Sequence, residues 1–506
     1  MNSPSLNGWR EAVFRAGVPA QPAVLPPGVE PMMVGSSSPA AQMLVLEGMT
    51  HLLTFGDMRA FLKFDAALRL DPDCLMAHWG RCMSLMGAGP AFQDQRVHSM
   101  KRMKELALRP DCPERERAYA DALAVLLMDG PVKAREAWKT ICSTWKRDPY
   151  APLFYAMLLR DGFDGQGNPG EGQKEAVRVV EDVLKERPGS QAAMRALLEE
   201  VAPSISPATV ETARRAVSAN PFSASAHHLL GHCLFRTGDY EGASAAFKES
   251  ENLCLAWEKA ENVSPALDDA YFRSILYRAV SEFCAGRYKR AEAIASRAAS
   301  VPLDKKHPLA PGTLLQLWEA RTLPARLMLA RPGLPRQVLV LKAFPGPLPK
   351  GFPDLSNGMT AVASQYMGAC YAARQGRTDA VASAFDKMSG ILRLLMDGAD
   401  AARRQMSVSY WARCLQAGSL YSSEIRSLMF PDSANVWMSE AIRSQRFSSL
   451  LLPPVVPYPA EWVLARAYLK AGKFRECADM CEQALKRFPN HAGVLETLDK
   501  ARSSGK

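Results

Sequence analysis

The sequence of 506 residues lacks the features that mark membrane-spanning and secreted proteins. No apolar run approaches the roughly 18 residues that a membrane-spanning helix needs. Residues 1–20 carry Arg10, Glu11 and Arg15 where the apolar centre of a secretory signal would lie. We therefore expect a cytoplasmic protein without a membrane span. A signal removed before this sequence begins would leave the same pattern.

Cysteine pairs and dense basic clusters are also scarce. The eleven cysteines are too few and too scattered for a disulfide scaffold. Cys477 and Cys481 lie one helical turn apart, but no second pair flanks them at zinc-site spacing. Lys101, Arg102 and Lys104 form about the richest basic group, so nucleic-acid binding is not expected. The formal net charge of +10 is spread along the chain and favours an acidic partner.

The signatures of catalytic and cofactor sites are missing or out of place. There is no P-loop, no G-x-S-x-G elbow and no H-E-x-x-H. Residues 165–170 fit G-x-G-x-x-G, but residues 155–160 before them look helical, whereas a dinucleotide site needs a strand there. His228 and His232 could share one face of a helix and bind a metal, yet no third ligand is evident nearby. We expect no catalytic, cofactor-binding or metal-binding residues.

What the sequence has in abundance is helix-forming residues in a repeating pattern. Alanine, leucine, arginine and lysine are common, and long β-branched runs are scarce. Helical stretches end repeatedly in a polar or basic residue followed by proline, which stops a helix. Successive prolines of this kind lie 38, 39, 39 and 33 residues apart, which suits a repeat of two helices. The pairs are Asp71-Pro72, Arg109-Pro110, Asp148-Pro149, Arg187-Pro188 and Asn220-Pro221.

A second signal lies in the middle of each repeat. A glycine separates two helical patterns, and an aromatic residue follows it two positions later. Glycine adopts the left-handed conformation that ends a helix at little cost, so we predict that conformation at these sites. The clear cases are Gly238-Asp239-Tyr240, Gly286-Arg287-Tyr288 and Gly472-Lys473-Phe474, and weaker ones are Gly56-Asp57-Met58 and Gly376-Arg377-Thr378.

The two signals combine in register, because Gly238 is followed by Tyr240, Ala243 and Phe247. This order resembles the tetratricopeptide repeat (TPR) family, and the best units are 41–74, 224–250, 267–300 and 458–491. The stretches 71–80 and 113–119 are similar to long bacterial multi-repeat members, and the resemblance covers roughly residues 40–502. It implies an all-α fold: a right-handed α-solenoid of helix-turn-helix repeats with a proline-rich irregular insertion.

The composition divides the chain into four parts. Residues 1–38 are rich in proline and glycine and read as a flexible leader, followed by a first array at 39–300. Residues 301–358 read as a proline-rich connection with short helices, including one at 313–330 interrupted at Pro324. Residues 359–506 read as a second array, with helices at 407–417 and 435–447 and a terminal capping helix at 491–502.

The resemblance also indicates a binding surface. In the helix that precedes Gly238, polar and aromatic side chains recur at helical spacing and form one stripe. In the TPR fold the first helix of each repeat lines a concave groove, so this stripe and its counterparts in later repeats would face a ligand. The predicted groove residues are Ser225, His228, His232, Phe235, Arg236, Arg273, Trp462, Arg466 and Lys470.

The sequence therefore predicts an interaction scaffold or adaptor that binds a protein or peptide in that groove, without catalysis. An acidic partner suits its basic side chains, and the oligomeric state stays open. Two alternatives remain. One is a regulatory or sensory protein that binds a small molecule or signalling peptide near residues 301–358. The other is an enzyme on a helical scaffold, whose site the sequence does not reveal.

Overall fold

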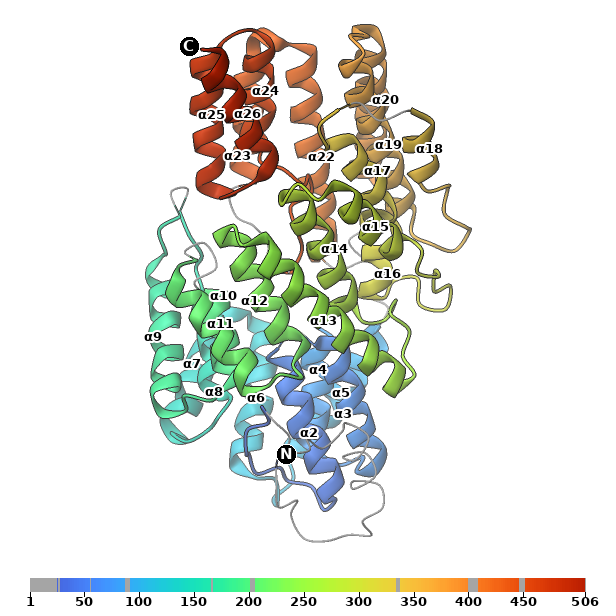
Figure 1. Ribbon diagram of the computed structural model, residues 1–506. Helices are drawn as coiled ribbons and strands as arrows, with labels where there is room; N and C mark the ends of the chain where they lie inside the picture. Colours follow the sequence, from blue (N-terminus) through green and yellow to red (C-terminus); the bar gives the residue numbers. More distant parts are fainter. Residues whose placement is uncertain are drawn as a thin grey trace. The chain divides into compact units, whose positions relative to one another are not determined.

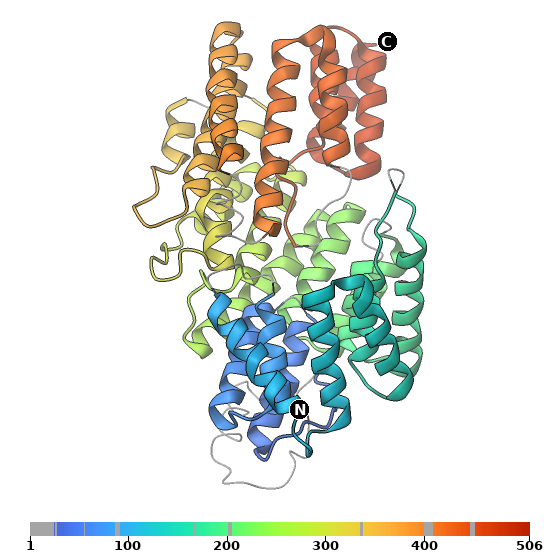
Figure 2. The ribbon, with the colours of Figure 1, turned by 180° about the vertical axis from the view of Figure 1, so that it is seen from behind.

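The chain folds into helices that pack in consecutive pairs (Figures 1 and 2). The structure, a computed structural model, describes residues 25, 28–54, 56–86, 92–164, 167–200, 205–333, 337–398, 408–445 and 451–505. These residues contain no strand beyond an isolated bridge between Phe163 and Pro169. The predicted all-α class of helix-turn-helix repeats is confirmed. The chain divides into two compact units, each described by itself.

Unit 1 comprises Met1–Met86, Phe92–Val201 and Ser218–Asn220. Its core contains four buried aromatic side chains in mutual contact, with ring centroids 5.0 to 6.3 Å apart: Trp79, Tyr119, Trp138 and Phe154. Each helix packs on the next one along the chain. The helices are α2 (Pro39–Leu52), α3 (Asp57–Leu70), α4 (Leu75–Ser84), α5 (Gln93–Ala107), α6 (Glu114–Asp129), α7 (Pro131–Thr144), α8 (Ala151–Leu159), α9 (Glu171–Glu186) and α10 (Gln191–Glu200).

Unit 2 comprises Gly87–Ala91, Ala202–Val217 and Pro221–Lys506. Most of α11 (Pro207–Ala219) belongs to it, and a π turn η2 (Gln316–Ala320) and a 3-10 turn η3 (Pro431–Ser433) interrupt its helices. The other helices are α12 (Ala224–Thr237), α13 (Tyr240–Glu261), α14 (Asp269–Cys284), α15 (Tyr288–Ala299), α16 (Pro311–Leu315), α17 (Arg321–Ala330), α18 (Gln337–Ala343), α19 (Asp354–Arg374), α20 (Thr378–Asp397), α22 (Val408–Met429), α23 (Ala434–Ser444), α24 (Ala460–Lys470), α25 (Phe474–Arg487) and α26 (Ala492–Ser504).

Glycines bring paired helices into close contact in both units. A Cβ atom on Gly80 of α4 would lie 2.1 Å from the ring of Phe64 on α3. A Cβ atom on Gly231 of α12 would lie 2.8 Å from the ring of Phe247 on α13. Both phenylalanines are fully buried. The absence of a side chain therefore lets a large ring fill the space between two helices.

The predicted turn glycines are left-handed in four of the five cases. Gly238, Gly286, Gly376 and Gly472 have φ values of 82°, 78°, 72° and 74°. The prediction for Gly56 is wrong, because its φ is −104° and it caps the start of α3. Helix α2 already ends at Leu52, so this glycine begins the second helix instead of ending the first.

The predicted proline turns also stand at helix ends. Each pair of a polar or basic residue and proline follows the last residue of α3, α5, α7, α9 or α11 within five positions. The second helix of each hairpin therefore stops where proline removes the next donor and blocks the helical path. The proline pairs that recur in the sequence therefore mark the ends of the hairpins.

The prediction of a helix interrupted at Pro324 is wrong in its position. Pro324 lies inside α17, and the irregularity is the π turn η2 that precedes this helix. A proline ring clashes with the carbonyl four residues earlier, here that of Ala320, the last residue of η2. The wider π turn supplies the room for the ring one turn before the proline itself.

Helices form near the C-terminus where the sequence predicts them, but their lengths differ from the predicted ones. The predicted helix at 407–417 is part of α22, which runs to Met429, and the terminal helix is α26. Ser407 and Phe447, the outer ends of two predicted helices, lie outside the described residues. The leader at 1–38 and the divisions at 301–358 stay predictions. Across the described ranges, no helix is both long and apolar enough to cross a bilayer.

We expect Gly231→Ala to destabilise unit 2 by about 1–3 kcal/mol, because the new methyl group must displace the buried ring of Phe247. Gly368 in α19 is the matched control, since a Cβ atom there meets nothing within 4 Å. Gly368→Ala should be neutral or stabilise by up to about 1 kcal/mol, as alanine favours helix. Denaturant unfolding of both variants measures the difference, and equal effects would refute the packing argument.

Candidate functional site

The predicted stripe on α12 is largely covered by α14. The helix begins at Ser223, whose hydroxyl accepts the amide hydrogen of Ala226, and it ends at the left-handed Gly238. His228, His232 and Phe235 are buried, with at most 5% of their surface exposed. The hydroxyl of Ser274 lies 3.1 Å from His228 Nδ1, and that of Tyr277 lies 3.1 Å from His232 Nδ1. These histidines therefore join two repeats in this structure. Ser225 and Arg236 are half-buried.

Tyr277 is the centre of this contact, and the sequence did not single it out. Its ring stacks on Phe247 at 4.9 Å and meets the edges of His228, His232 and Phe235 at 5.4 to 5.7 Å. The sequence held one signal that could have identified Tyr277: it lies one helical turn after Arg273, a residue that we assigned to the groove. Arg273 itself is half-buried and pairs with Asp269 on its own helix.

Burial sets the charge state of this cluster. It lowers the pKa of His232 well below its ordinary value, and the charge of Arg236 lowers that pKa further. Burial also lowers the pKa of the Arg236 guanidinium. His232 is therefore neutral at physiological pH and acts as a hydrogen-bonding ring.

In the last repeat, the exposure of the predicted residues increases along α24, from the core to the surface. Trp462 is buried, and its indole N–H donates to the Thr497 hydroxyl at 2.8 Å. The guanidinium of Arg466 lies 4.4 Å from the centre of the Trp462 ring and 5.4 Å from that of Tyr458. Arg466 is half-buried and Lys470, one turn further, is exposed. Contact of the nine predicted residues with a partner stays a prediction.

An irregular stretch of the chain, residues 451–459, is bound by side chains of unit 2. Arg413 of α22 donates to the Pro453 carbonyl at 2.7 Å, and Arg326 of α17 donates to that of Val455. Gln445 donates to the Tyr458 carbonyl at 3.1 Å. These three contacts are directed at the main chain of the segment.

Buried carboxylates organise the groups around that stretch. Glu319 of η2 accepts both N–H groups of Arg413 at 2.9 Å, a bidentate pair. Glu424 of α22 accepts the hydroxyls of Tyr366 at 2.7 Å and Tyr458 at 2.8 Å. Burial raises the pKa of both tyrosines well above 10, and the charge of Glu424 adds to the rise. The phenols stay protonated and act as donors.

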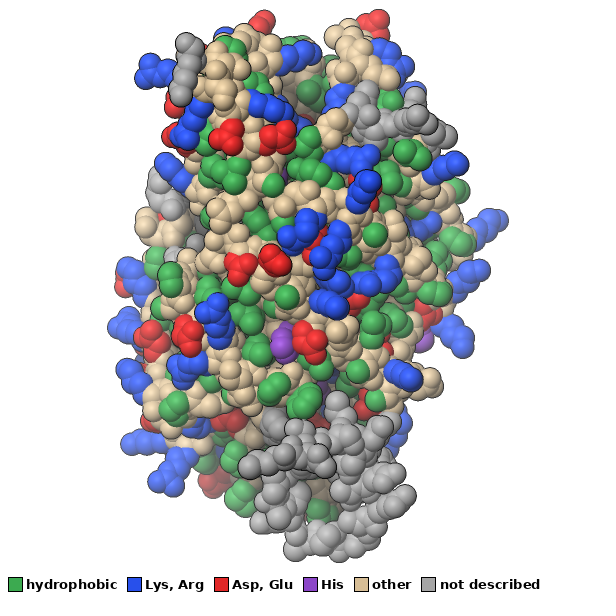
Figure 3. All heavy atoms as spheres, in the orientation of Figure 1, with side chains coloured by type: hydrophobic (Ala, Val, Ile, Leu, Met, Phe, Trp, Pro, Cys, Tyr) green, Lys and Arg blue, Asp and Glu red, His purple; other side chains and the backbone are tan. Residues whose placement is uncertain are grey.

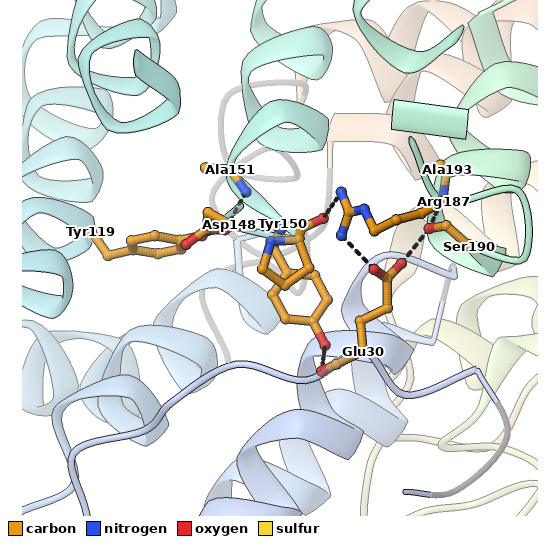
Figure 4. A network of polar contacts seen from close by, with 9 residues as sticks. Glu30, Tyr119, Asp148, Tyr150, Ala151, Arg187, Ser190 and Ala193 are labelled. Carbon is orange, nitrogen blue, oxygen red and sulfur yellow. Dashed lines mark hydrogen bonds and ion pairs between the residues drawn. The ribbon is translucent and has the colours of Figure 1, made fainter. Parts of the chain in front are cut away.

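A second stretch without helix, which is extended, is bound in unit 1. Residues 28–36, called the strap, run beside the turns that join its hairpins. Figure 4 shows the Glu30 carboxylate pointing at Arg187 and Ser190, both of which donate to it. The hydroxyl of Tyr150 donates to the main-chain oxygen of Glu30 at 3.0 Å. Both the side chain and the main chain of the strap are therefore recognised.

The remaining candidate chemistry of the sequence leads to no metal site. Among the parts of the chain that the structure describes, no three His, Cys, Asp or Glu side chains are grouped so that they could hold a metal ion. Gly165 and Gln166 of the G-x-G-x-x-G stretch lie outside those parts. Gly170, the last residue of the stretch, caps the start of α9, and the helix α8 precedes it.

The comparison with protein families matches residues 224–254 to the model described as Tetratricopeptide repeat. These residues are α12 and the first part of α13, the hairpin built around Gly231 and Phe247. One hairpin of the chain therefore matches the TPR family model. This confirms the predicted resemblance to the TPR family, while the similarity to bacterial members stays a prediction. None of the curated proteins matches the chain.

Solved structures of TPR-type proteins are similar to the chain at low identity. They include the Cut9–Hcn1 hetero-tetramer of the APC/C, with a TM-score of 0.37 and 10% identity over 92% of this chain and 77% of that one. Yeast Tom70 gives 0.33 and 12% identity over 92% and 88%. The TPR domain of P58(IPK) gives 0.21 and 14% identity over 91% and 97%.

The burial of His491 should make the free energy of unfolding depend on pH. This fully buried ring caps α26 and lies 5.2 Å from Trp462, and burial lowers its pKa to about 4. Its pKa is about 6.5 when unfolded. Between pH 6.5 and 4 the unfolded chain gains a proton that the folded chain does not bind, so stability falls as pH falls, by up to about 3 kcal/mol.

The variant His491→Asn keeps a capping side chain but does not titrate in this range. We expect its free energy of unfolding to fall less steeply than that of the wild type between pH 6.5 and 4. Denaturant unfolding at several pH values measures both slopes. Identical slopes would show that His491 is not held neutral by the fold.

Proposed function

We propose that this protein, which contains a TPR hairpin, is an interaction scaffold or adaptor that binds an extended segment of a partner protein and performs no catalytic step. A helical hairpin array presents a long surface on which a few anchor side chains supply most of the binding energy. The TPR hairpin at residues 224–254 supports a role of this general kind.

The observation that carries the proposal is that side chains of the helical hairpins bind the main chain of segments outside the helices, one of which, the strap, is extended. In unit 2, Arg413 and Arg326 donate to carbonyls of residues 451–459. In unit 1, Tyr150 donates to the main chain of the strap. The donors stand on helices of different hairpins, as a peptide crossing an array requires. Main-chain recognition combined with selected side-chain contacts is the usual way in which proteins bind extended peptides.

A partner would first contact the exposed end of the predicted stripe on α24. Lys470 is exposed, and Arg466 one turn before it is half-buried against Trp462. Both are cationic, so they favour an acidic segment through charge-assisted hydrogen bonds and long-range attraction. Trp462, which is buried beneath them, gives this surface a rigid base.

We expect Lys470→Glu to lower the amount of partner retained in affinity purification from native lysate by about tenfold, because it reverses a charge that faces the partner. The matched control is Lys486→Glu on α25, an exposed lysine on the second helix of the same hairpin. Quantitative mass spectrometry of proteins retained by the wild type and both variants measures the effect. Binding of the purified partner to each variant then confirms that the contact is direct.

A partner lost equally with both variants would point to a general charge effect and would contradict a groove on α24. A wild-type chain that retains no protein would contradict the scaffold proposal as a whole. Thermal unfolding of each variant serves as the check that the substitution leaves the fold intact, since both lysines are exposed and unfolding temperatures should stay unchanged.

One specific observation favours the small-ligand alternative near residues 301–358. An open surface depression of about 650 Å³ lies where Arg331, just past α17, meets the start of α15. Arg287, Lys289 and Arg290 line it together with Arg331. Lys and Arg side chains gather on the face over α14 in Figure 3. An anionic small molecule is the ligand class that suits such a lining.

Two carboxylates partly neutralise these cations. Glu282 pairs with Arg287 and Arg290, and Glu292 pairs with Arg331 at 2.8 Å. Four cationic side chains thus share two acidic ones, and the lining keeps a net positive charge. The second candidate function is therefore a sensor of an anionic metabolite.

If the depression binds anions, citrate should raise the unfolding temperature of the wild type and should do so much less in the double variant Lys289→Ala/Arg290→Ala. Both side chains are exposed, so the variant should fold normally. Lys486→Ala is the control for an unspecific ionic effect. A citrate shift that is the same in all three proteins would exclude this candidate.

A further inference from the structure

The strap of unit 1 contacts four successive turns of the array. At one end its Glu30 carboxylate is bound by Arg187 and Ser190, between α9 and α10. At the other end its Ser36 hydroxyl donates to Asp71, in the turn after α3. These are the turns that the proline pattern marks in the sequence. A single extended segment therefore crosses the edge of the whole array.

Between its ends, the strap is recognised mainly through its main chain. Arg115 at the start of α6 donates to the Met33 carbonyl. The amide of Gly35 donates to the carboxylate of Glu116 at 2.5 Å. A Cβ atom at Gly35 would lie 3.0 Å from Pro113 and 3.2 Å from the Glu116 carboxylate, so a side chain here would press on the turn before α6, and glycine suits this position.

The side chains of the strap alternate between the array and solvent. Met32 and Val34 are 8% and 7% exposed, whereas Met33 between them is 86% exposed. Glu30 falls on the same face as Met32 and Val34, as the two-residue period of an extended chain requires. The groove therefore binds an acidic side chain and two apolar side chains at alternate positions, and a glycine follows them.

The groove is built by contacts that do not involve the strap. The buried Asp148 accepts the Tyr119 hydroxyl at 2.7 Å and the amides of Tyr150 and Ala151 at 2.9 Å each (Figure 4). This network fixes Tyr150 at the start of α8, where its hydroxyl meets the strap. The recognition side chain thus keeps its position without its occupant.

The clamp for the carboxylate is positioned in the same way. Arg187 also donates to the Pro149 carbonyl at 3.2 Å, which links two successive turns. The Ser190 hydroxyl accepts the amide of Ala193 at 3.2 Å and so belongs to the first turn of α10. A cation and a hydroxyl held by their own repeats form a site for any carboxylate that replaces that of Glu30.

We propose that this row of turns is a peptide-binding groove for a partner segment of the pattern acidic-x-apolar-x-apolar-glycine, and that the strap occupies it until such a segment displaces it. The inference rests on the proposed scaffold function and names the chemistry of its partner. The strap competes as part of the same chain, at a high effective concentration. A partner therefore binds strongly only when further contacts add to those of its segment.

The test uses the full chain with an altered strap, so that every groove residue stays unchanged. The strap variant carries Glu30→Lys, Met32→Asp and Val34→Asp. The probe is a fluorescent peptide with the sequence of residues 28–38, and anisotropy measures its dissociation constant. We expect the strap variant to bind this peptide at least about tenfold more tightly than the wild type, because its own strap no longer fills the groove.

Two controls show that the peptide binds in the groove. A peptide that carries Glu30→Gln should bind the strap variant about tenfold more weakly, since it lacks the charge for the Arg187 clamp. Adding Arg187→Leu to the strap variant should remove the preference for the charged peptide. If the triple change prevents folding, as thermal unfolding would show, Glu30→Lys alone replaces it with the same peptides.

A folded strap variant that binds the peptide no better than the wild type would overturn the proposal. So would a dimer of the wild type that the peptide dissociates, because the occupant would then be the strap of a second copy. Both outcomes leave the scaffold function standing if the Lys470→Glu variant still loses a partner. The two proposals can therefore fail separately.

Discussion

The fold depends on how closely two helices of one hairpin approach each other. At Gly48 of α2 and Gly231 of α12, an aromatic ring from the second helix of the hairpin lies where a side chain of the first would begin. The ring fills the whole space between the helices, and this fixes their distance and rotation. Hairpins packed in this way place successive turns of unit 1 beside one another along the strap, and those turns bind its extended chain.

The parts of the fold that could be predicted are those set by signals within one hairpin. Proline after a helix and glycine between two helices act over a few residues, so their spacing revealed the repeat. The family match at residues 224–254 falls on a unit that follows Asn220-Pro221 and contains Gly238-Asp239-Tyr240. Gly56 and Pro324 misled the prediction because the same residue types also start helices and tolerate a neighbouring π turn.

The candidate site was harder to predict because its contacts join distant residues. The pairs Tyr277 and His232, Glu319 and Arg413, and Glu30 and Arg187 are 45, 94 and 157 positions apart. A polar stripe on one helix looks the same whether water or another helix covers it. His228 and His232 lie under α14, and no property of their own segment distinguishes this burial from exposure.

The turn at residues 488–491 gives unit 2 a property that simple repeat arrays lack. Pro489 lies against Gly238, and Asn490 donates to the Gly238 carbonyl over a separation of 252 residues. Repeats that touch only their neighbours can fold stepwise, whereas this contact closes a long loop and so slows folding. At 5–20 residues per second, the ribosome needs roughly 10–50 s to make the intervening chain. During synthesis, the edge of α12 is therefore without its cover for that time, and it depends on chaperones or on its own solubility.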